Sequence, residues 1–223
     1  MEDTMSAVFA RKAALRKGML RTLRQMPEDA VASQSAAVAR ILVQQDWYKS
    51  AQTVGCYLSM ARGELRTTEI VADLLANGKA LYTPYLPPAA IAGEDNLMHM
   101  LRLYSPADLA ACPTDKWGIL DPGTQRHDAA GPREDAMDGP PLDLILVPGV
   151  AFDAHCNRLG RGKAFYDRFL ATYTAQRRRP LLMALALEPQ LIDEDVPVTP
   201  DDFTLDGVVS PRGVVWRDGK PRA

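Results

Sequence analysis

A strand, a short loop rich in glycine and basic residues, and a helix follow one another between Asp143 and Leu170. The apolar run 144–147, closed by a Pro-Gly pair, is typical of a buried strand that ends in a turn. The loop 158–163 reads Arg-Leu-Gly-Arg-Gly-Lys, and apolar residues at helical spacing follow it. The start of a helix presents unpaired backbone N–H groups and a partial positive charge, and glycines let an anion approach that backbone. The pattern therefore predicts phosphate binding at the start of this helix.

A carboxylate stands about one helical turn after the loop. Asp167 follows Lys163 at that spacing, where it could hold a metal ion bound to the same phosphate. The loop has neither the glycine pattern of dinucleotide-binding proteins nor that of a Walker loop. The alternative is an ordinary strand-to-helix turn with solvated basic side chains, and the spacing alone does not decide between the two.

Composition limits the class of protein. The 223 residues are 47% hydrophobic and 24% charged, which is ordinary for one globular domain spanning 1–223. The net charge of −2 argues against a general nucleic-acid partner, and no apolar run reaches the ~20 residues of a membrane span. Acidic residues at positions 2 and 3 argue against a secretory signal and favour the cytoplasm over the mitochondrion. Three scattered cysteines predict neither a disulfide framework nor a zinc site.

Strands alternate with helices along most of the chain, which predicts a three-layer α/β fold around a mostly parallel sheet. Helices are expected over 6–25, 28–46 and 67–77, and a short helix or a turn is expected over 108–115. Strands are expected over 53–58, 79–83, 97–103, 181–187, 207–210 and 213–216. We interpret 123–141 as a flexible excursion within the domain.

Four further side chains are candidates for the same site. Ligands of open α/β sheets gather at the carboxyl ends of strands, so Glu64, in the loop after the first strand, is expected to face the same crevice as the loop 158–163. Lys12 and Arg16 share one face of the first helix. For all three side chains, exposure to solvent is the alternative. Trp117 suits either the core or a platform for a flat ligand, and the residues alone favour the core.

Several of these motifs together resemble a known family. The runs Val-Pro-Gly-Val-Ala-Phe-Asp (147–153), Asn-Arg-Leu-Gly-Arg-Gly-Lys (157–163) and Phe-Tyr-Asp (165–167) are similar to the signature of the 5-formyltetrahydrofolate cyclo-ligases, also called methenyltetrahydrofolate synthetases. The resemblance covers nearly the whole chain. It implies a mixed α/β sheet flanked by helices, related to the phosphosugar isomerase folds. We also expect a monomer.

The resemblance also implies roles for particular residues. Lys12, Arg161 and Lys163 would be catalytic, and Asp167 and Asp202 would hold Mg²⁺. The ATP-binding residues would be Lys12, Arg16, Arg158, Leu159, Gly160, Arg161, Gly162, Lys163, Ala164, Phe165 and Tyr166. The folate-binding residues would be Leu58, Met60, Glu64, Trp117, Arg161, Gly162, Lys163, Ala164 and Phe165.

The chain departs from the family pattern at three positions. Ala164 and Phe165 stand where relatives often have glycine and tyrosine, so we expect retained activity with altered folate contacts. Cys156 replaces a usual glycine, which predicts a turn that does not require a positive φ.

The implied reaction is the ATP- and Mg²⁺-dependent closure of 5-formyltetrahydrofolate to 5,10-methenyltetrahydrofolate, with release of ADP and phosphate. Phosphorylation of the formyl oxygen would create a leaving group, and N10 would then attack the activated carbon. Two alternatives stay open. One is a phosphosugar isomerase or deaminase of related fold, and the other is a folate or nucleotide binder without catalysis.

Overall fold

The computed structural model describes residues 2–88, 97–114 and 118–219. A seven-stranded sheet forms its centre, in the order β3-β2-β1-β4-β7-β8-β9. Its strands are β1 (Thr53–Cys56), β2 (Ala80–Tyr85), β3 (His99–Leu103), β4 (Leu144–Val147), β7 (Leu181–Leu185), β8 (Gly207–Ser210) and β9 (Gly213–Trp216). The five inner strands are parallel, and the outer strands β3 and β9 are antiparallel to their neighbours. A mixed α/β sheet flanked by helices, as predicted, is thereby confirmed.

The inner strands are apolar on both faces because helices cover both sides. In β4, Leu144 and Leu146 pack into one core cluster, whereas Ile145 and Val147 pack into the other. This alternation explains why the sequence reads as a continuous apolar run rather than as a hydrophobic–polar repeat. The run is therefore a buried strand, as its composition predicts.

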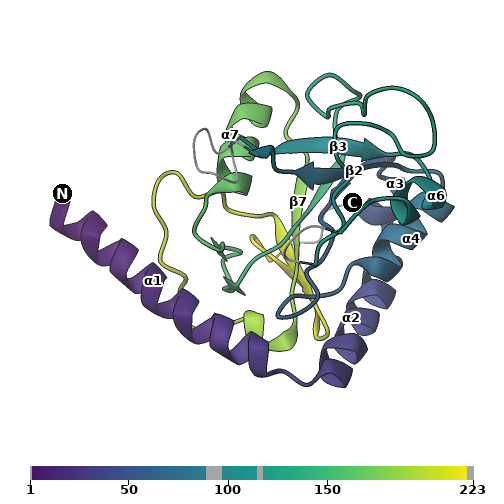
Figure 1. Ribbon diagram of the computed structural model, residues 1–223. Coiled ribbons are helices and arrows are strands. Elements are labelled where there is room, and N and C mark those ends of the chain that lie inside the picture. Colours follow the sequence, from purple (N-terminus) through teal and green to yellow (C-terminus); the bar gives the residue numbers. More distant parts are fainter. Residues whose placement is uncertain (1, 89–96, 115–117, 220–223) are drawn as a thin grey trace.

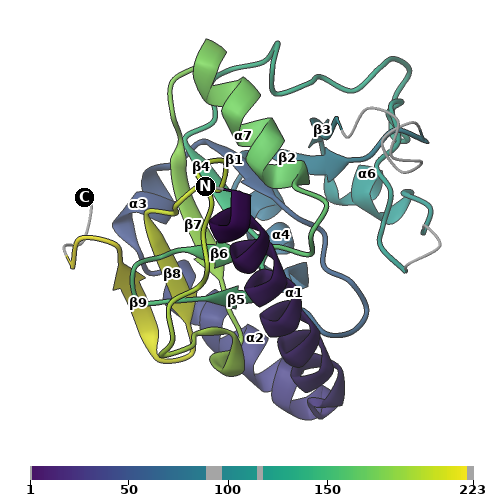
Figure 2. The ribbon, with the colours of Figure 1, turned by 90° about the vertical axis from the view of Figure 1, so that its left-hand side faces the viewer.

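Figures 1 and 2 show the helices on the two sides of the sheet. Core residues of α2 (Glu28–Leu42), α3 (Asp46–Ser50) and α4 (Thr68–Ala76) belong to one cluster, and those of α7 (Phe165–Gln176) belong to the other. The long helix α1 (Glu2–Gln25) packs through a third, smaller cluster that includes Leu15 and Met19. The short pieces are α6 (Pro106–Ala110), η1 (Glu188–Gln190) and a separate antiparallel pair, β5 (Ala151–Phe152) and β6 (Arg158–Leu159). No helix among the described residues is long and apolar enough to cross a membrane.

Two expectations about regular structure are wrong. The helix predicted to end near Asp46 ends at Leu42, and a separate helix, α3, starts at Asp46. The second strand continues through Pro84 to Tyr85, although proline was expected to end it. The pairing of β2 with β1 stops at Tyr82, so the missing N–H of Pro84 leaves that pairing intact.

The segment 123–141 is anchored, not flexible. The backbone N–H of Arg102 donates to Glu134, and that of Ala136 donates to Met100, so the segment runs along β3. Arg133 donates to the carboxylate of Asp108 at 2.7 Å, and both side chains are fully buried. A buried ion pair fixes this excursion to α6, although its Gly- and Pro-rich composition suggested a free loop.

Candidate active site

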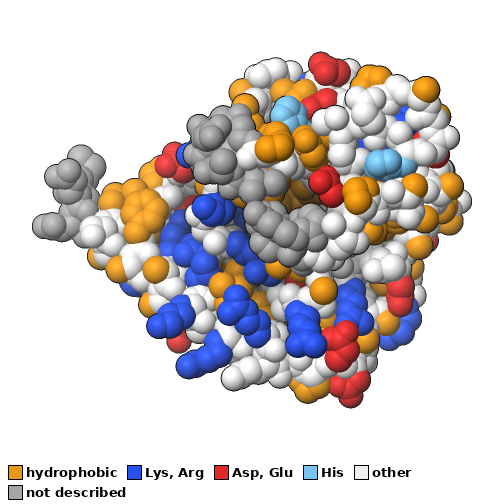
Figure 3. Space-filling view, in the orientation of Figure 1, with side chains coloured by type: hydrophobic (Ala, Val, Ile, Leu, Met, Phe, Trp, Pro, Cys, Tyr) orange, Lys and Arg blue, Asp and Glu red, His pale blue; other side chains and the backbone are white. Residues whose placement is uncertain are grey.

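A cavity of about 1100 Å³ opens at the carboxyl ends of β1, β2 and β4. Its wall is formed by α1, the loops after β1 and β4, the end of β2, the segment from β6 to the start of α7, and the loop 199–203. Lysine and arginine side chains gather on the face of the molecule that carries α1 (Figure 3). Every predicted site residue that the structure describes lines this cavity. Trp117 lies outside the described residues.

The backbone has a positive φ at two positions near the end of the basic loop. Gly162 has φ +94° and Ala164 has φ +54°, so the chain turns sharply just before α7 begins. No side chain of the described residues caps the start of this helix. The first N–H groups of α7 are therefore left for solvent or a ligand beside the cavity. This is the arrangement that the sequence predicted for a phosphate.

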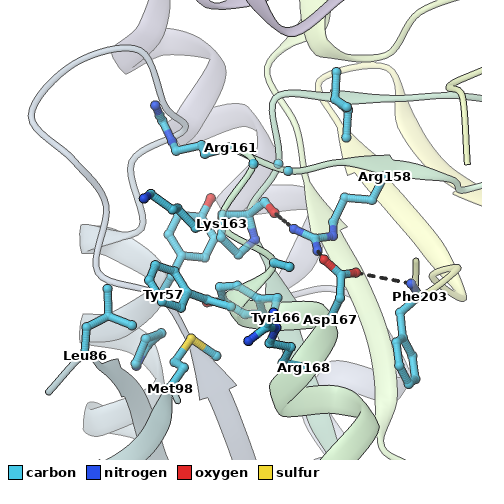
Figure 4. Close-up of a pocket in the computed structure, with 18 of the residues that line it drawn as sticks. Tyr57, Leu86, Met98, Arg158, Arg161, Lys163, Tyr166, Asp167, Arg168 and Phe203 are labelled. Atoms are coloured by element: carbon cyan, nitrogen blue, oxygen red, sulfur yellow. Dashed lines mark hydrogen bonds and ion pairs between the residues drawn. The ribbon is translucent and has the colours of Figure 1, made fainter. Parts of the chain in front are cut away.

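Arg158, the first residue of this loop, has a buried side chain. Its guanidinium donates to the Asp167 carboxylate at 2.7 Å and to the Pro148 carbonyl at 3.2 Å, and its side chain is 5% exposed (Figure 4). It also lies over the Tyr166 ring, 5.7 Å from the centroid. Nε of Arg158 is buried without a hydrogen-bond partner among the described residues. Arg158 thus ties the start of the loop to α7 and to the turn after β4, whereas Arg161 and Lys163 are exposed.

Two cations of α1 reach the same place. Arg16 donates from Nε to the Gly160 carbonyl at 2.8 Å, and Lys12 forms an ion pair with Asp202. Lys12 is 7% exposed, so the alternative of a solvated basic flank is wrong for this residue. Burial acts to raise the pKa of Asp202, but hydrogen bonds from Lys12 and Thr199 outweigh it and lower the pKa below its usual range. Asp202 is therefore a carboxylate at neutral pH.

Glu64 faces the cavity from the loop after β1. It is 7% exposed, so solvent exposure is also wrong for this side chain. Its carboxylate accepts a hydrogen bond from the Met60 N–H at 3.0 Å and lies 3.6 Å from Nη2 of Arg161. Burial raises the pKa of Glu64, and these two contacts offset only part of that effect. Glu64 therefore links the loop after β1 to the basic loop.

The donor set suits a magnesium ion shared with a phosphate. Asp167 and Asp202 both line the cavity, and Asp167 accepts a hydrogen bond at 3.2 Å from the N–H of Phe203, the residue after Asp202. Arg158 donates to Asp167, and Lys12 pairs with Asp202. No group of three or more His, Cys, Asp or Glu side chains forms a metal cage among the described residues. Mg²⁺ commonly takes one or two carboxylates and completes its shell with water and substrate phosphates. The two aspartates fit that role.

Several cavity residues were not predicted from the sequence. Phe9, Tyr57, Met98 and Phe203 line the cavity together with the residues above. Tyr57, Met98 and Phe203 lie just outside helices and strands, and nothing in the sequence around them separates a cavity wall from the core. Phe9 differs from them, because its large apolar side chain stands in a basic stretch of the chain.

The Cys156 prediction is wrong. Cys156 has φ +61° and is fully buried, so this turn does require a positive φ and a thiol occupies it. The side chain packs into the core cluster on the α7 side, which offsets the strain of the left-handed backbone.

Comparisons with a family model, with relatives and with solved structures all point to the same family. A family model described as the 5-formyltetrahydrofolate cyclo-ligase family matches residues 8–211. The mitochondrial 5-formyltetrahydrofolate cyclo-ligase of Arabidopsis thaliana is 31% identical and aligns with 96% of this chain and 79% of its own. The 5-formyltetrahydrofolate cyclo-ligase of Mus musculus is 32% identical and aligns with 91% and 94%. The NMR structure of the 5,10-methenyltetrahydrofolate synthetase from Aquifex aeolicus matches with a TM-score of 0.72 at 28% identity, over 95% of both chains.

Proposed function

The chain belongs to the 5-formyltetrahydrofolate cyclo-ligase family, and we propose that it catalyses the ATP- and Mg²⁺-dependent cyclisation of 5-formyltetrahydrofolate to 5,10-methenyltetrahydrofolate. One observation carries the proposal beyond the family: a single cavity contains both the basic loop before α7 and the buried Glu64. Arg161 of this loop lies 3.6 Å from the Glu64 carboxylate. A nucleotide phosphate and a folate bound at these positions would meet at Arg161.

The chemistry needs positioning more than a covalent nucleophile. The formyl oxygen attacks the terminal phosphorus of ATP, the bond from that phosphorus to the bridging oxygen breaks, and ADP leaves. N10 then attacks the activated formyl carbon, its proton is lost to solvent, and the carbon–oxygen bond breaks with departure of phosphate. The oxygen of an amide is a poor leaving group, and its phosphorylation removes that obstacle. Holding the two reactants in line accounts for much of the acceleration in such reactions.

The chain's own residues have distinct roles in this proposal. Arg161 and Lys163 neutralise charge on the transferred phosphoryl group, and the uncapped start of α7 donates backbone N–H groups to it. Lys12 and Arg16 contact the other phosphates. Asp167 and Asp202 would hold Mg²⁺, which supplies positive charge to the phosphates when bound.

The folate side is formed by the loop after β1. Glu64 accepts hydrogen bonds from polar N–H groups of the folate, and Leu58 and Met60 contact its apolar parts. Ala164 and Phe165 lie at the boundary between the two ligands, and both line the cavity. The folate role of Trp117, the single domain 1–223, the cytoplasmic location and the monomeric state stay predictions from the sequence.

The alternatives make different demands on the site. A phosphosugar isomerase or deaminase of related fold would use a carboxylate or histidine base and no ATP, and the relation of this fold to those proteins also stays a prediction. A binder without catalysis would gain support from Ala164 and Phe165. Asp167 and the two exposed loop cations instead favour phosphoryl transfer.

An absorbance assay separates these functions. Absorbance of 5,10-methenyltetrahydrofolate should grow only when ATP, Mg²⁺ and 5-formyltetrahydrofolate are present together. Arg161→Ala or Lys163→Ala should lower turnover by about a hundredfold with unchanged far-UV circular dichroism, as expected when one charge-stabilising donor is lost. Lys17→Ala is the matched control, because this exposed lysine of α1 does not line the cavity. Product formation without ATP, or near-normal turnover of both loop variants, would reject the proposal.

A further inference from the structure

Phe9 is a large aromatic side chain held at the cavity without being buried. It lines the cavity and is 56% exposed, in a protein whose other phenylalanines are buried or half-buried. Phe9 precedes Lys12 by one helical turn on the same face of α1. An exposed ring beside a phosphate-binding cation offers a flat apolar surface to a ligand.

Contacts along the cavity place its residues in order. Glu64 contacts Arg161, and the neighbouring Gly160 accepts a hydrogen bond from Arg16. One turn back along α1, Lys12 pairs with Asp202. The order is therefore the folate loop, the basic loop, and the corner formed by Asp202.

The aromatic residues stand at the far end of this order. Phe9 lies one turn beyond Lys12, and Phe203 follows Asp202 in the chain. Figure 4 shows Phe203 on the opposite side of Asp167 from Tyr57 and Leu86. Ala171 follows Asp167 by one turn of α7, and Pro200 lies in the loop that carries Asp202; both line the cavity, as do the polar residues Thr199 and Asp201.

The proposed reaction fixes which ligand can occupy that end. The formyl group has to meet the terminal phosphoryl group of ATP, so the folate and the nucleobase lie on opposite sides of the phosphates. The folate is assigned to the Glu64 side, and the base therefore lies at the other end. Phe9 and Arg16 are seven residues apart, which is about 10 Å along a helix. A helix that contacts phosphates through Arg16 and Lys12 thus carries Phe9 toward the base.

We propose that the end of the cavity formed by Phe9, Ala171, Pro200 and Phe203 is the nucleobase subsite, and that the adenine ring stacks on Phe9. This inference rests on the proposed function, because the reaction orients the nucleotide. Base–aromatic stacking contributes enough that alanine substitution typically weakens binding by about five- to a hundredfold. Phe9 thus binds the nucleotide and takes no part in the phosphoryl transfer.

Binding measurements test the subsite without requiring turnover. Titration calorimetry would compare ATP with tripolyphosphate, which has the phosphates but no base, both with magnesium. Phe9→Ala should weaken ATP binding about tenfold and leave tripolyphosphate binding unchanged. Phe9→Trp should restore ATP binding, and ATP should quench the fluorescence of the new tryptophan. In the assay, Phe9→Ala should raise KM for ATP about tenfold, with kcat and KM for the folate unchanged.

Controls separate this inference from a structural effect and from the function itself. Met5→Ala removes another exposed apolar side chain of α1 that does not line the cavity, and it should not change ATP binding. If Phe9→Ala weakens the binding of ATP and of tripolyphosphate equally, or leaves ATP binding unchanged, the subsite is contradicted. It is also contradicted if the wild-type protein binds ATP and tripolyphosphate with equal affinity. Failure of the proposed function has another signature, since the wild type would then form no methenyltetrahydrofolate whatever it binds.

Discussion

Glu64 shows how a single residue can be unfavourable for the fold and useful for the site. Its carboxylate is buried at the cavity, and burial raises its pKa although Met60 and Arg161 act in the opposite direction. Such a group favours the protonated form in the folded state. The ionised form therefore costs stability at neutral pH, and this cost disappears as the pH falls below the ordinary pKa of glutamate.

Glu64→Gln should therefore stabilise the ligand-free protein and impair folate binding. At about pH 7 the variant should melt at a higher temperature than the wild type, because the amide still accepts the Met60 N–H without burying a charge. The difference should shrink toward about pH 4, where the wild-type carboxyl is protonated. KM for the folate should rise about tenfold through loss of a charged acceptor. A variant that melts below the wild type at neutral pH would contradict this account.

Ala164 carries strain that the basic loop requires. Its φ of +54° lies in the left-handed region, which costs a residue with a Cβ about 1–2 kcal/mol. Ala164→Gly removes this cost but adds chain entropy to the unfolded state, so the free energy of unfolding should rise by about 0.5 kcal/mol. Ala171→Gly, inside α7, should instead lower it by about 1 kcal/mol. Urea unfolding measures both, and a destabilised Ala164→Gly variant would show that the backbone is not strained.

At the scale of one residue, the sequence predicted chemistry better than conformation. Its candidate cations and carboxylates all line one cavity, although Lys12, Arg16 and Asp202 were candidates through the family resemblance alone. It did not predict the backbone of Cys156, where φ is +61°, since tertiary packing decides whether a turn must be left-handed. Nor did it predict that Arg158 would be buried beneath its own loop.

Helices and strands were predicted correctly where a single local sequence pattern dominates. The continuous apolar run of β4 and the helical spacing of α7 were both recognisable from the sequence. The segment 123–141 was not, because its order comes from Arg133, which pairs with Asp108 and also donates to the Pro122 carbonyl at 2.8 Å. Pro122 lines the cavity, so this buried pair holds part of the wall.

Arg133→Met should destabilise the protein by about 3–5 kcal/mol, because it leaves the buried carboxylate of Asp108 unpaired. Arg212→Met is the control; its partner Glu188 is exposed, and the change should be below about 1 kcal/mol. Urea unfolding at neutral pH measures both, and similar small losses would contradict a structural role for the buried pair.

The same pair predicts a pH dependence. Burial acts to raise the pKa of Asp108, but Arg133 and backbone N–H donors lower it to about 2. Because the folded-state pKa is depressed, the stabilisation is present above the ordinary pKa of about 4 and is lost as the pH falls toward 2. Wild-type stability should decline over that interval more steeply than that of Arg133→Met, and parallel curves would count against the pair.

At the scale of the whole molecule, the site is an assembly of distant segments. Lys12 and Asp202 are 190 residues apart in the chain and form one ion pair. The sequence alone placed each of them by resemblance to a family and not by geometry, because no local pattern encodes a contact at that separation. They meet because α1 and the loop before β8 both line the cavity that opens at the carboxyl ends of β1, β2 and β4.

The proposed reaction moves one oxygen atom from folate to phosphate inside that cavity, and an isotope experiment follows this atom. The substrate is 5-formyltetrahydrofolate with the heavy oxygen isotope in its formyl group, supplied with ATP and Mg²⁺ in ordinary water. Mass spectrometry of the released phosphate should find one heavy oxygen atom for each methenyltetrahydrofolate formed. Phosphate without the label, with the heavy oxygen recovered in water, would contradict phosphorylation of the formyl oxygen.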